Sequence, residues 1–130
     1  MKNILAIGAH PDDIEISCLG YLLKNSIEKK SKISVFIVSS GSLKDPTSGM
    51  KRIKESKEAL RCIKGLNFYY RATKGIKIKD FEKISNNMRK LILDINPNEI
   101  LGLEKYFVTI LNRLKHINFE NVQKQKNLIL

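Results

Sequence analysis

Hydrophobic residues along the first hundred positions form short continuous runs, separated by longer segments in which they recur at helical spacing. Continuous runs are typical of parallel strands that are buried on both faces, whereas helical spacing predicts amphipathic helices. The predicted strands are residues 2–8, 33–38, 66–70 and 99–103. The predicted helices are residues 15–30, 50–64 and 80–94. This βαβαβαβ order predicts an α/β fold: a Rossmann-like three-layer sandwich with a mainly parallel sheet.

The helical spacing also predicts which side chains pack on the sheet. In the first helix they are Ile16, Leu19, Leu22, Leu23 and Ile27. In the second they are Ile53, Ala59, Leu60 and Ile63. In the third they are Phe81, Ile84, Met88, Leu91 and Ile92. Residues 39–49 read as a loop rich in turn formers, Gly65 as the glycine that ends the second helix, and Asp80 as the cap of the third.

Residues 9–15 (Ala-His-Pro-Asp-Asp-Ile-Glu) place one imidazole and three carboxylates between the first strand and the first helix. Open α/β sheets bind their ligands at such strand ends. A histidine and a carboxylate bind divalent metals, and a second carboxylate that stays off the metal serves as a general base. In a purely structural alternative, Asp12 and Asp13 cap the helix and Pro11 fixes the turn. That alternative leaves His10 unexplained, so we favour the functional one.

Residues 9–15, with a partial match at 17–20, closely resemble the signature of the PIG-L/LmbE-like deacetylases. Members of this family are zinc-dependent enzymes that remove N-acetyl groups from N-acetylglucosamine-type sugars. The resemblance implies that His10 and Asp13 bind zinc or another divalent metal. It also implies that Asp12 stays free as the catalytic general base.

The family's third zinc ligand is the last histidine of an H-x-D-H-type motif that follows the fourth strand. The better register places residues 118–121 on this motif, so Asn121 stands at the ligand position and Glu120 replaces the aspartate. In the other register His116 reaches the metal. An asparagine amide is a weaker zinc ligand than imidazole, so we expect a low metal affinity, low enough for the metal to be lost.

Arg52 and Glu55 lie three residues apart in the second predicted helix. They are similar to an R-x-x-E pair of the family, which implies that Arg52 borders the site and binds substrate. The spacing alone predicts an ordinary surface ion pair worth ~0.3 kcal/mol. Glu15, one turn into the first helix, is expected to be structural because it favours the helix dipole.

The chain carries 24 Lys and Arg against 13 Asp and Glu, a net charge of +11. The basic residues are interspersed with Ile, Leu and Asn, so we interpret them as a solvated surface and expect no nucleic-acid partner. No apolar run approaches the ~20 residues that span a bilayer. Two cysteines are too few for a disulfide framework. We expect Cys18 and Cys62 to be buried thiols, which suits a reducing cytoplasm.

Together these features predict a single domain over residues 1–130, in which residues 1–102 match the family well, residues 103–130 diverge and the C-terminal part is incomplete. The implied function is a cytoplasmic zinc-dependent N-deacetylase of amino sugars or glycoconjugates. The alternative is a catalytically inactive, truncated homologue that acts as a binding protein or is a non-functional remnant. A third hypothesis, a nucleotide binder, requires a G-x-G-x-x-G turn. The chain instead has two aspartates at that turn, where they would repel a pyrophosphate.

Overall fold

A computed structural model describes residues 2–41 and 46–102 of the chain. Within them, one parallel sheet has the strand order β3-β2-β1-β4. The strands are β1 (Asn3–Gly8), β2 (Lys32–Ile37), β3 (Asn67–Tyr70) and β4 (Glu99–Gly102). Each strand lies within a residue or two of its predicted position, so the predicted parallel α/β architecture is confirmed.

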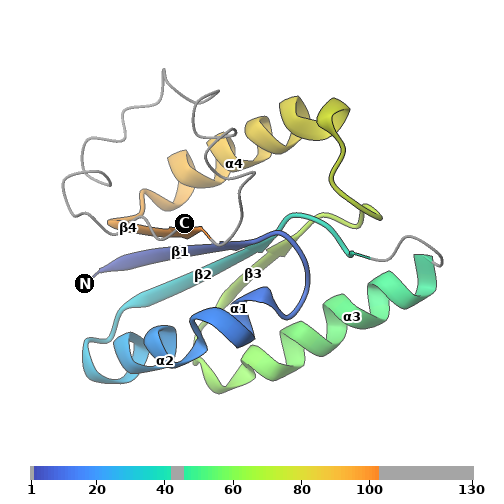
Figure 1. Cartoon of the computed structure of the whole chain (residues 1–130). Helices are drawn as coiled ribbons and strands as arrows, with labels where there is room; N and C mark the ends of the chain where they lie inside the picture. The colour runs from blue at the N-terminus through green and yellow to red at the C-terminus, as the bar shows by residue number, and fades with distance from the viewer. Residues whose placement is uncertain (1, 42–45, 103–130) are drawn as a thin grey trace.

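Helices cover both faces of this sheet. They are α1 (Asp13–Ser17), α2 (Leu19–Glu28), α3 (Pro46–Ala59) and α4 (Phe81–Ile95). Short 3-10 turns lie at Leu60–Cys62 (η1) and Ile78–Asp80 (η2). Figure 1 shows α1, α2 and α3 on one face of the sheet and α4 on the other. The three-layer sandwich is therefore confirmed.

Side chains of β1 alternate between two apolar cores because successive residues of a strand point to opposite faces. Leu5 and Ile7 point toward α4, where they pack with Phe36, Val38, Ile84, Met88, Ile92 and Ile100. Ile4 and Ala6 point to the opposite face, where they pack with Ile14, Cys18, Leu22, Ile33, Val35, Ile37, Leu60, Ile63 and Leu101. The near-continuous apolar runs thus reflect burial of both faces.

The helix predicted over residues 15–30 is two helices, which meet at Cys18, where the backbone is not helical (φ −143°, ψ 12°). Two of its five predicted core positions are wrong, because Ile16 is 81% and Ile27 68% exposed. Ile16 lies in the short α1, whose buried side chain is Ile14. Residue 27 is rotated by about 140° from the buried Leu22 around α2, so it faces solvent. The remaining three are confirmed: Leu22 is buried, and Leu19 and Leu23 are partly buried.

Helix α3, which corresponds to the second predicted helix, begins at Pro46, four residues earlier than predicted. The loop predicted over residues 39–49 is therefore shorter. Proline suits a first helical position, where its missing N–H costs nothing. After Ala59 the chain tightens into η1. In consequence Ala59 and Cys62 are exposed, which corrects both predictions. The other predicted core residues of this segment are buried: Ile53, Leu60 and Ile63.

Helix α4, which corresponds to the third predicted helix, matches its prediction most closely. Phe81, Ile84, Met88 and Ile92 are buried, and Leu91 packs partly buried against them. Asp80 stands at the N-cap position but its side chain makes no capping bond, because its carboxylate accepts the Lys77 backbone N–H over 3.1 Å instead. In the described part of the chain, no helix has the length and apolar character required to cross a membrane.

Candidate active site at the end of strand β1

The candidate site lies beside the point where the strand order reverses. From β1 the chain crosses one face of the sheet through α1 and α2 to β2, whereas β4, on the other side of β1, is reached through α4 on the opposite face. Open α/β sheets bind ligands at the carboxyl ends of strands at such a switch point. His10, Asp12 and Asp13 follow β1 directly and therefore stand at this position.

The turn after β1 gives its two aspartates different environments. Asp12 occupies the N-cap of α1 in the left-handed conformation (φ 75°), makes no side-chain capping bond, and keeps its carboxylate largely exposed. Aspartate tolerates this conformation better than most residues. Asp13 turns back instead, and its Oδ2 accepts the His10 backbone N–H over 2.8 Å. One carboxylate is thus fixed beside His10 and the other is open to solvent.

Two hydrogen bonds join the backbone after β1 to the segment after β2. Ser39 donates from both its backbone N and its Oγ to the Ala9 carbonyl, each over 3.0 Å. A side chain at Gly8 would place its Cβ 3.2 Å from the Asp13 Cβ. Glycine at the end of β1 therefore allows the first turn of α1 to lie directly against the strand, and the Ser39 bonds fix the residue before His10.

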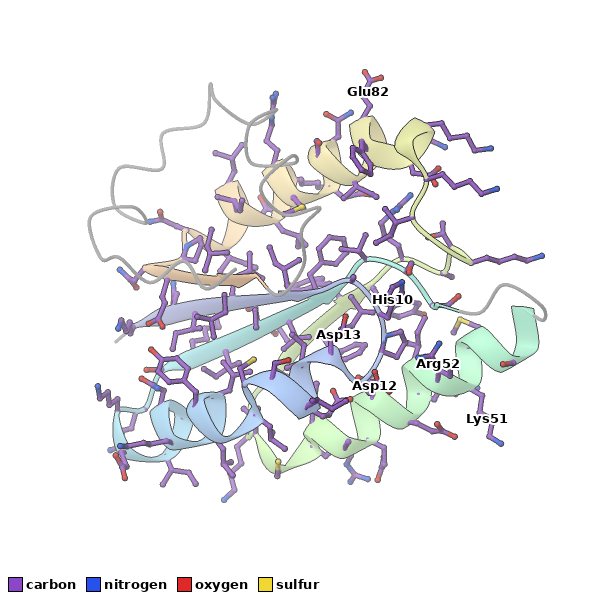
Figure 2. The ribbon with its side chains drawn as sticks, viewed as in Figure 1. His10, Asp12, Asp13, Lys51, Arg52 and Glu82 are labelled. Carbon is purple, nitrogen blue, oxygen red and sulfur yellow. The ribbon has the colours of Figure 1, made fainter. Side chains whose placement is uncertain are left out.

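Arg52 reaches this turn from α3. Its Nη2 lies 4.0 Å from Asp12 Oδ2, and its Nη1 donates to the Ser40 carbonyl over 3.4 Å. Figure 2 shows Arg52 directed toward Asp12, while the neighbouring Lys51 points away from the site. Within the described residues, Arg52 is therefore paired with Asp12, not with Glu55 as its spacing alone would predict.

Gly41 makes room for this arginine. It has a left-handed φ of +70°, and a Cβ at this position would lie 2.6 Å from Arg52 Nη1 and 3.1 Å from His10 Cδ2. A side chain here would displace the guanidinium and press on the imidazole ring. The glycine after β2 thus allows Arg52 and His10 to approach the same segment of backbone.

Glu15 connects the same turn to α3, one helical turn beyond Arg52. Its Oε1 accepts a hydrogen bond from Ser56 Oγ over 2.8 Å. Burial raises the pKa of Glu15, and the charges of Asp12 and Asp13 add to this, while the Ser56 bond opposes it. Glu15 is predicted from the sequence to be structural, whereas Ser56 is not among the predicted residues. The available signal was the four-residue spacing that puts Ser56 on the same helix face as Arg52.

His10 and Asp13 are the candidate metal ligands, and the chemistry of this pair fits a divalent ion. Both side chains are half-buried and belong to the same turn. Imidazole nitrogen and carboxylate oxygen are both common zinc ligands. Such a pair would provide two of the three protein ligands that a catalytic zinc site requires. Within residues 2–41 and 46–102, no three His, Cys, Asp or Glu side chains form a metal-binding group. Asn121 and His116 lie outside the described residues.

The parallel sheet between two helical layers, with an imidazole and two carboxylates beside its switch point, defines a Rossmann-like α/β protein with a candidate metal site. The family model of PIG-L, described as GlcNAc-PI de-N-acetylase, matches residues 5–124. The chain belongs to this family, as the resemblance of residues 9–15 implies.

Individual relatives match shorter parts of the chain. "Uncharacterized deacetylase YaiS" of Escherichia coli (strain K12) is 41% identical over 63 residues, 48% of this chain and 32% of that protein. "Photosystem II assembly factor Ycf39" of Trieres chinensis is 42% identical over 55 residues, 39% of this chain and 17% of that protein. These matches span a third or less of each curated relative.

A solved structure supports the fold. N,N'-diacetylchitobiose deacetylase from Pyrococcus horikoshii superimposes with a TM-score of 0.62 at 21% sequence identity. The superposition covers 77% of this chain and 40% of the other chain. The two proteins therefore share the Rossmann-like architecture described above.

Proposed function

We propose that this protein is a metal-dependent N-deacetylase that hydrolyses the acetamide of an amino sugar or glycoconjugate. His10 and Asp13 would hold zinc or another divalent ion, with Asn121 or His116 in the third position. Asp12 would act as the general base and Arg52 would contact the substrate. Family membership supports the reaction class, and the names of two similar proteins carry the word deacetylase.

The observation that carries the proposal is the unequal treatment of two adjacent carboxylates. Asp13 is engaged by the His10 backbone N–H, whereas Asp12 is exposed beside Arg52. The proposed reaction needs such a division, since one carboxylate would bind the metal and the other would exchange a proton. Capping of α1 does not account for the arrangement, because Asp12 makes no side-chain capping bond.

Each of these residues has a chemical task in the proposed reaction. Asp12 accepts a proton from the attacking water as the water oxygen bonds to the carbonyl carbon of the acetamide. It then returns the proton to the nitrogen as the C–N bond breaks, which yields acetate and a free amine. A metal held by His10 and Asp13 would supply Lewis acidity, which lowers the pKa of bound water toward ~7 and polarises the carbonyl. Arg52 is near enough to Asp12 to orient its carboxylate.

The test is acetate release from N-acetylglucosamine-type substrates by the zinc-loaded chain and by Asp12→Asn. Asparagine also tolerates the left-handed conformation, so this change removes the base and keeps the turn. The rate is expected to fall by about 10²- to 10⁴-fold. Glu82→Gln is the matched control, because Glu82 is exposed on α4 away from the site. Release that survives in Asp12→Asn would contradict the assignment of Asp12.

A second candidate is an inactive homologue, and Asn121 in the third ligand position favours it. Zinc content of the purified chain beside Asp13→Ala separates the two candidates. Stoichiometric zinc that is lost in Asp13→Ala supports the enzyme. A chain that takes up no zinc at micromolar metal and releases no acetate supports the inactive homologue.

We also propose a cytoplasmic location. Both cysteines of the chain, Cys18 and Cys62, are free thiols in the structure. Unpaired cysteines suit a compartment that is kept reducing. Fractionation of cells that express the untagged chain would test this, and recovery in an oxidising compartment would contradict it.

A further inference from the structure

Two parallel contacts join the first turn of α1 to α3. Asp12 is the N-cap of α1 and Glu15 lies in the helix itself, whereas Arg52 and Ser56, four residues apart, lie on one face of α3. Arg52 Nη2 lies 4.0 Å from Asp12 Oδ2, and Ser56 Oγ donates to Glu15 Oε1 over 2.8 Å. The Arg52–Asp12 contact thus involves the candidate base. The Ser56–Glu15 contact lies one helical turn further along α3.

The two contacts differ in how firmly they are held. The Asp12 and Arg52 side chains are 61% and 37% exposed, and an exposed pair at this distance is weak by itself. Ser56 is 3% exposed and Glu15 is half-buried. A hydrogen bond from a buried hydroxyl to a carboxylate is the stronger interaction. Of these two contacts, the Glu15–Ser56 bond is therefore the one better able to hold α3 against α1.

We propose that Glu15 and Ser56 are positioning residues, whose hydrogen bond fixes α3 against α1 and so holds the Arg52 guanidinium beside Asp12. If α3 shifts along its axis, the Cα and Cβ atoms of Arg52 move with it, and the guanidinium is carried away from Asp12. This inference rests on the proposed function in so far as Asp12 is the base.

The first test observes Arg52 directly and needs neither substrate nor metal. The side-chain Nε–H resonance of Arg52, assigned by its loss in Arg52→Lys, is followed by NMR. Ser56→Ala removes the donor and Glu15→Ala the acceptor, and each is expected to shift or broaden this resonance. Glu15→Gln is expected to retain it, because the glutamine amide oxygen accepts the same hydroxyl.

Ser85→Ala is the matched control. Ser85 is also a buried helical serine, but its Oγ donates to the Phe81 carbonyl within α4, on the other face of the sheet. It is expected to leave the Arg52 resonance unchanged. If Ser56→Ala also leaves that resonance unchanged, with a loss of stability in urea equal to that of Ser85→Ala, the bond is merely structural and the inference is overturned.

Kinetics provide the second test. Ser56→Ala is expected to lower kcat by about tenfold while KM stays within about twofold, because a misplaced catalytic group slows the reaction more than it weakens binding. The same substitution is expected to have little further effect in an Arg52→Ala background, since it acts through Arg52. Full additivity would overturn the inference. If the parent chain releases no acetate, the proposed function fails, and the NMR result still decides the positioning role.

Discussion

The Arg52 guanidinium lies 4.0 Å from the Asp12 carboxylate and also donates to the Ser40 carbonyl. One side chain of α3 thus contacts the segments that follow both β1 and β2. Arginine suits this task because its planar group presents several N–H donors in a fixed fork. Helix α3 therefore contributes a side chain that contacts both strand-end segments at the candidate site.

The first prediction concerns replacement of this arginine by lysine. Arg52→Lys keeps the charge but has a single ammonium, which cannot reach both Asp12 and Ser40 in the same geometry. We expect kcat/KM for acetate release to fall by about tenfold, the equivalent of one lost charge-assisted hydrogen bond. Lys51→Arg is the control, because Lys51 is exposed and points away from the site. Equal effects of the two substitutions would contradict a specific role for Arg52.

The second prediction compares two glycines with the same backbone conformation. Gly41 and Gly65 have φ values of +70° and +72°, so alanine at either position should cost about 1 kcal/mol of unfolding free energy. A Cβ at Gly65 would have nothing within 4 Å, whereas a Cβ at Gly41 would meet Arg52 and His10. The arginine end is flexible and can move aside, so the stability losses should be similar.

Activity should separate these two variants. Gly41→Ala is expected to displace the Arg52 guanidinium and to abolish most of the acetate release, while Gly65→Ala keeps it. Urea unfolding measures the stability of each variant, and initial rates measure its activity. If Gly41→Ala retains the parent rate, then the approach of Arg52 to this backbone is not needed for the reaction.

The sheet and the site's location were predictable from local pattern. Strands buried on both faces have continuous apolar runs, and parallel strands place their carboxyl ends at one edge of the sheet. Once β1 was recognised, His10, Asp12 and Asp13 had to follow it at that edge. The spacing of apolar residues also identified the buried face of α4 correctly.

The failures concern helix phase and contacts between helices. The break at Cys18 leaves Ile16 and Ile27 exposed, and periodicity within one segment cannot reveal such a break. The contacts of Arg52 with Asp12 and of Ser56 with Glu15 depend on the offset between α3 and α1. That offset is set by contacts between segments far apart in the sequence, which no spacing along the chain reveals.

The third prediction concerns alkaline pH. At the end of the sheet opposite the candidate site, Glu99 is 1% exposed, accepts a hydrogen bond from Tyr21 Oη and lies 2.9 Å from Lys2 Nζ. Burial, together with the bond and charge of Glu99, raises the pKa of Tyr21 to about 12. This value exceeds the ~10 of an unfolded tyrosine. Tyr21 therefore contributes stability fully below pH ~10, and this contribution is lost as the pH rises toward 12.

Tyr21→Phe tests this relation. At pH 8 it should lower the unfolding free energy by about 1 kcal/mol, since it removes a hydroxyl that pairs with a buried carboxylate. Above pH 10 the variant should lose stability less steeply than the parent chain. Tyr70→Phe is the control, because Tyr70 is exposed on β3 and phenylalanine retains its ring contact with Phe68. Parallel pH profiles for Tyr21→Phe and the parent would contradict the prediction.

The fourth prediction concerns the two thiols. Burial, with a smaller effect from the charge of Glu15, raises the pKa of Cys18 to about 11. Because the thiolate is the nucleophile, Cys18 should react very slowly with iodoacetamide at pH 7.5, whereas the exposed Cys62 should react readily. Intact mass with peptide mapping should show one label, on Cys62, in the folded chain and two in denaturant. Equal labelling of both thiols in the folded chain would mean that Cys18, at the junction of α1 and α2, does not pack into the core.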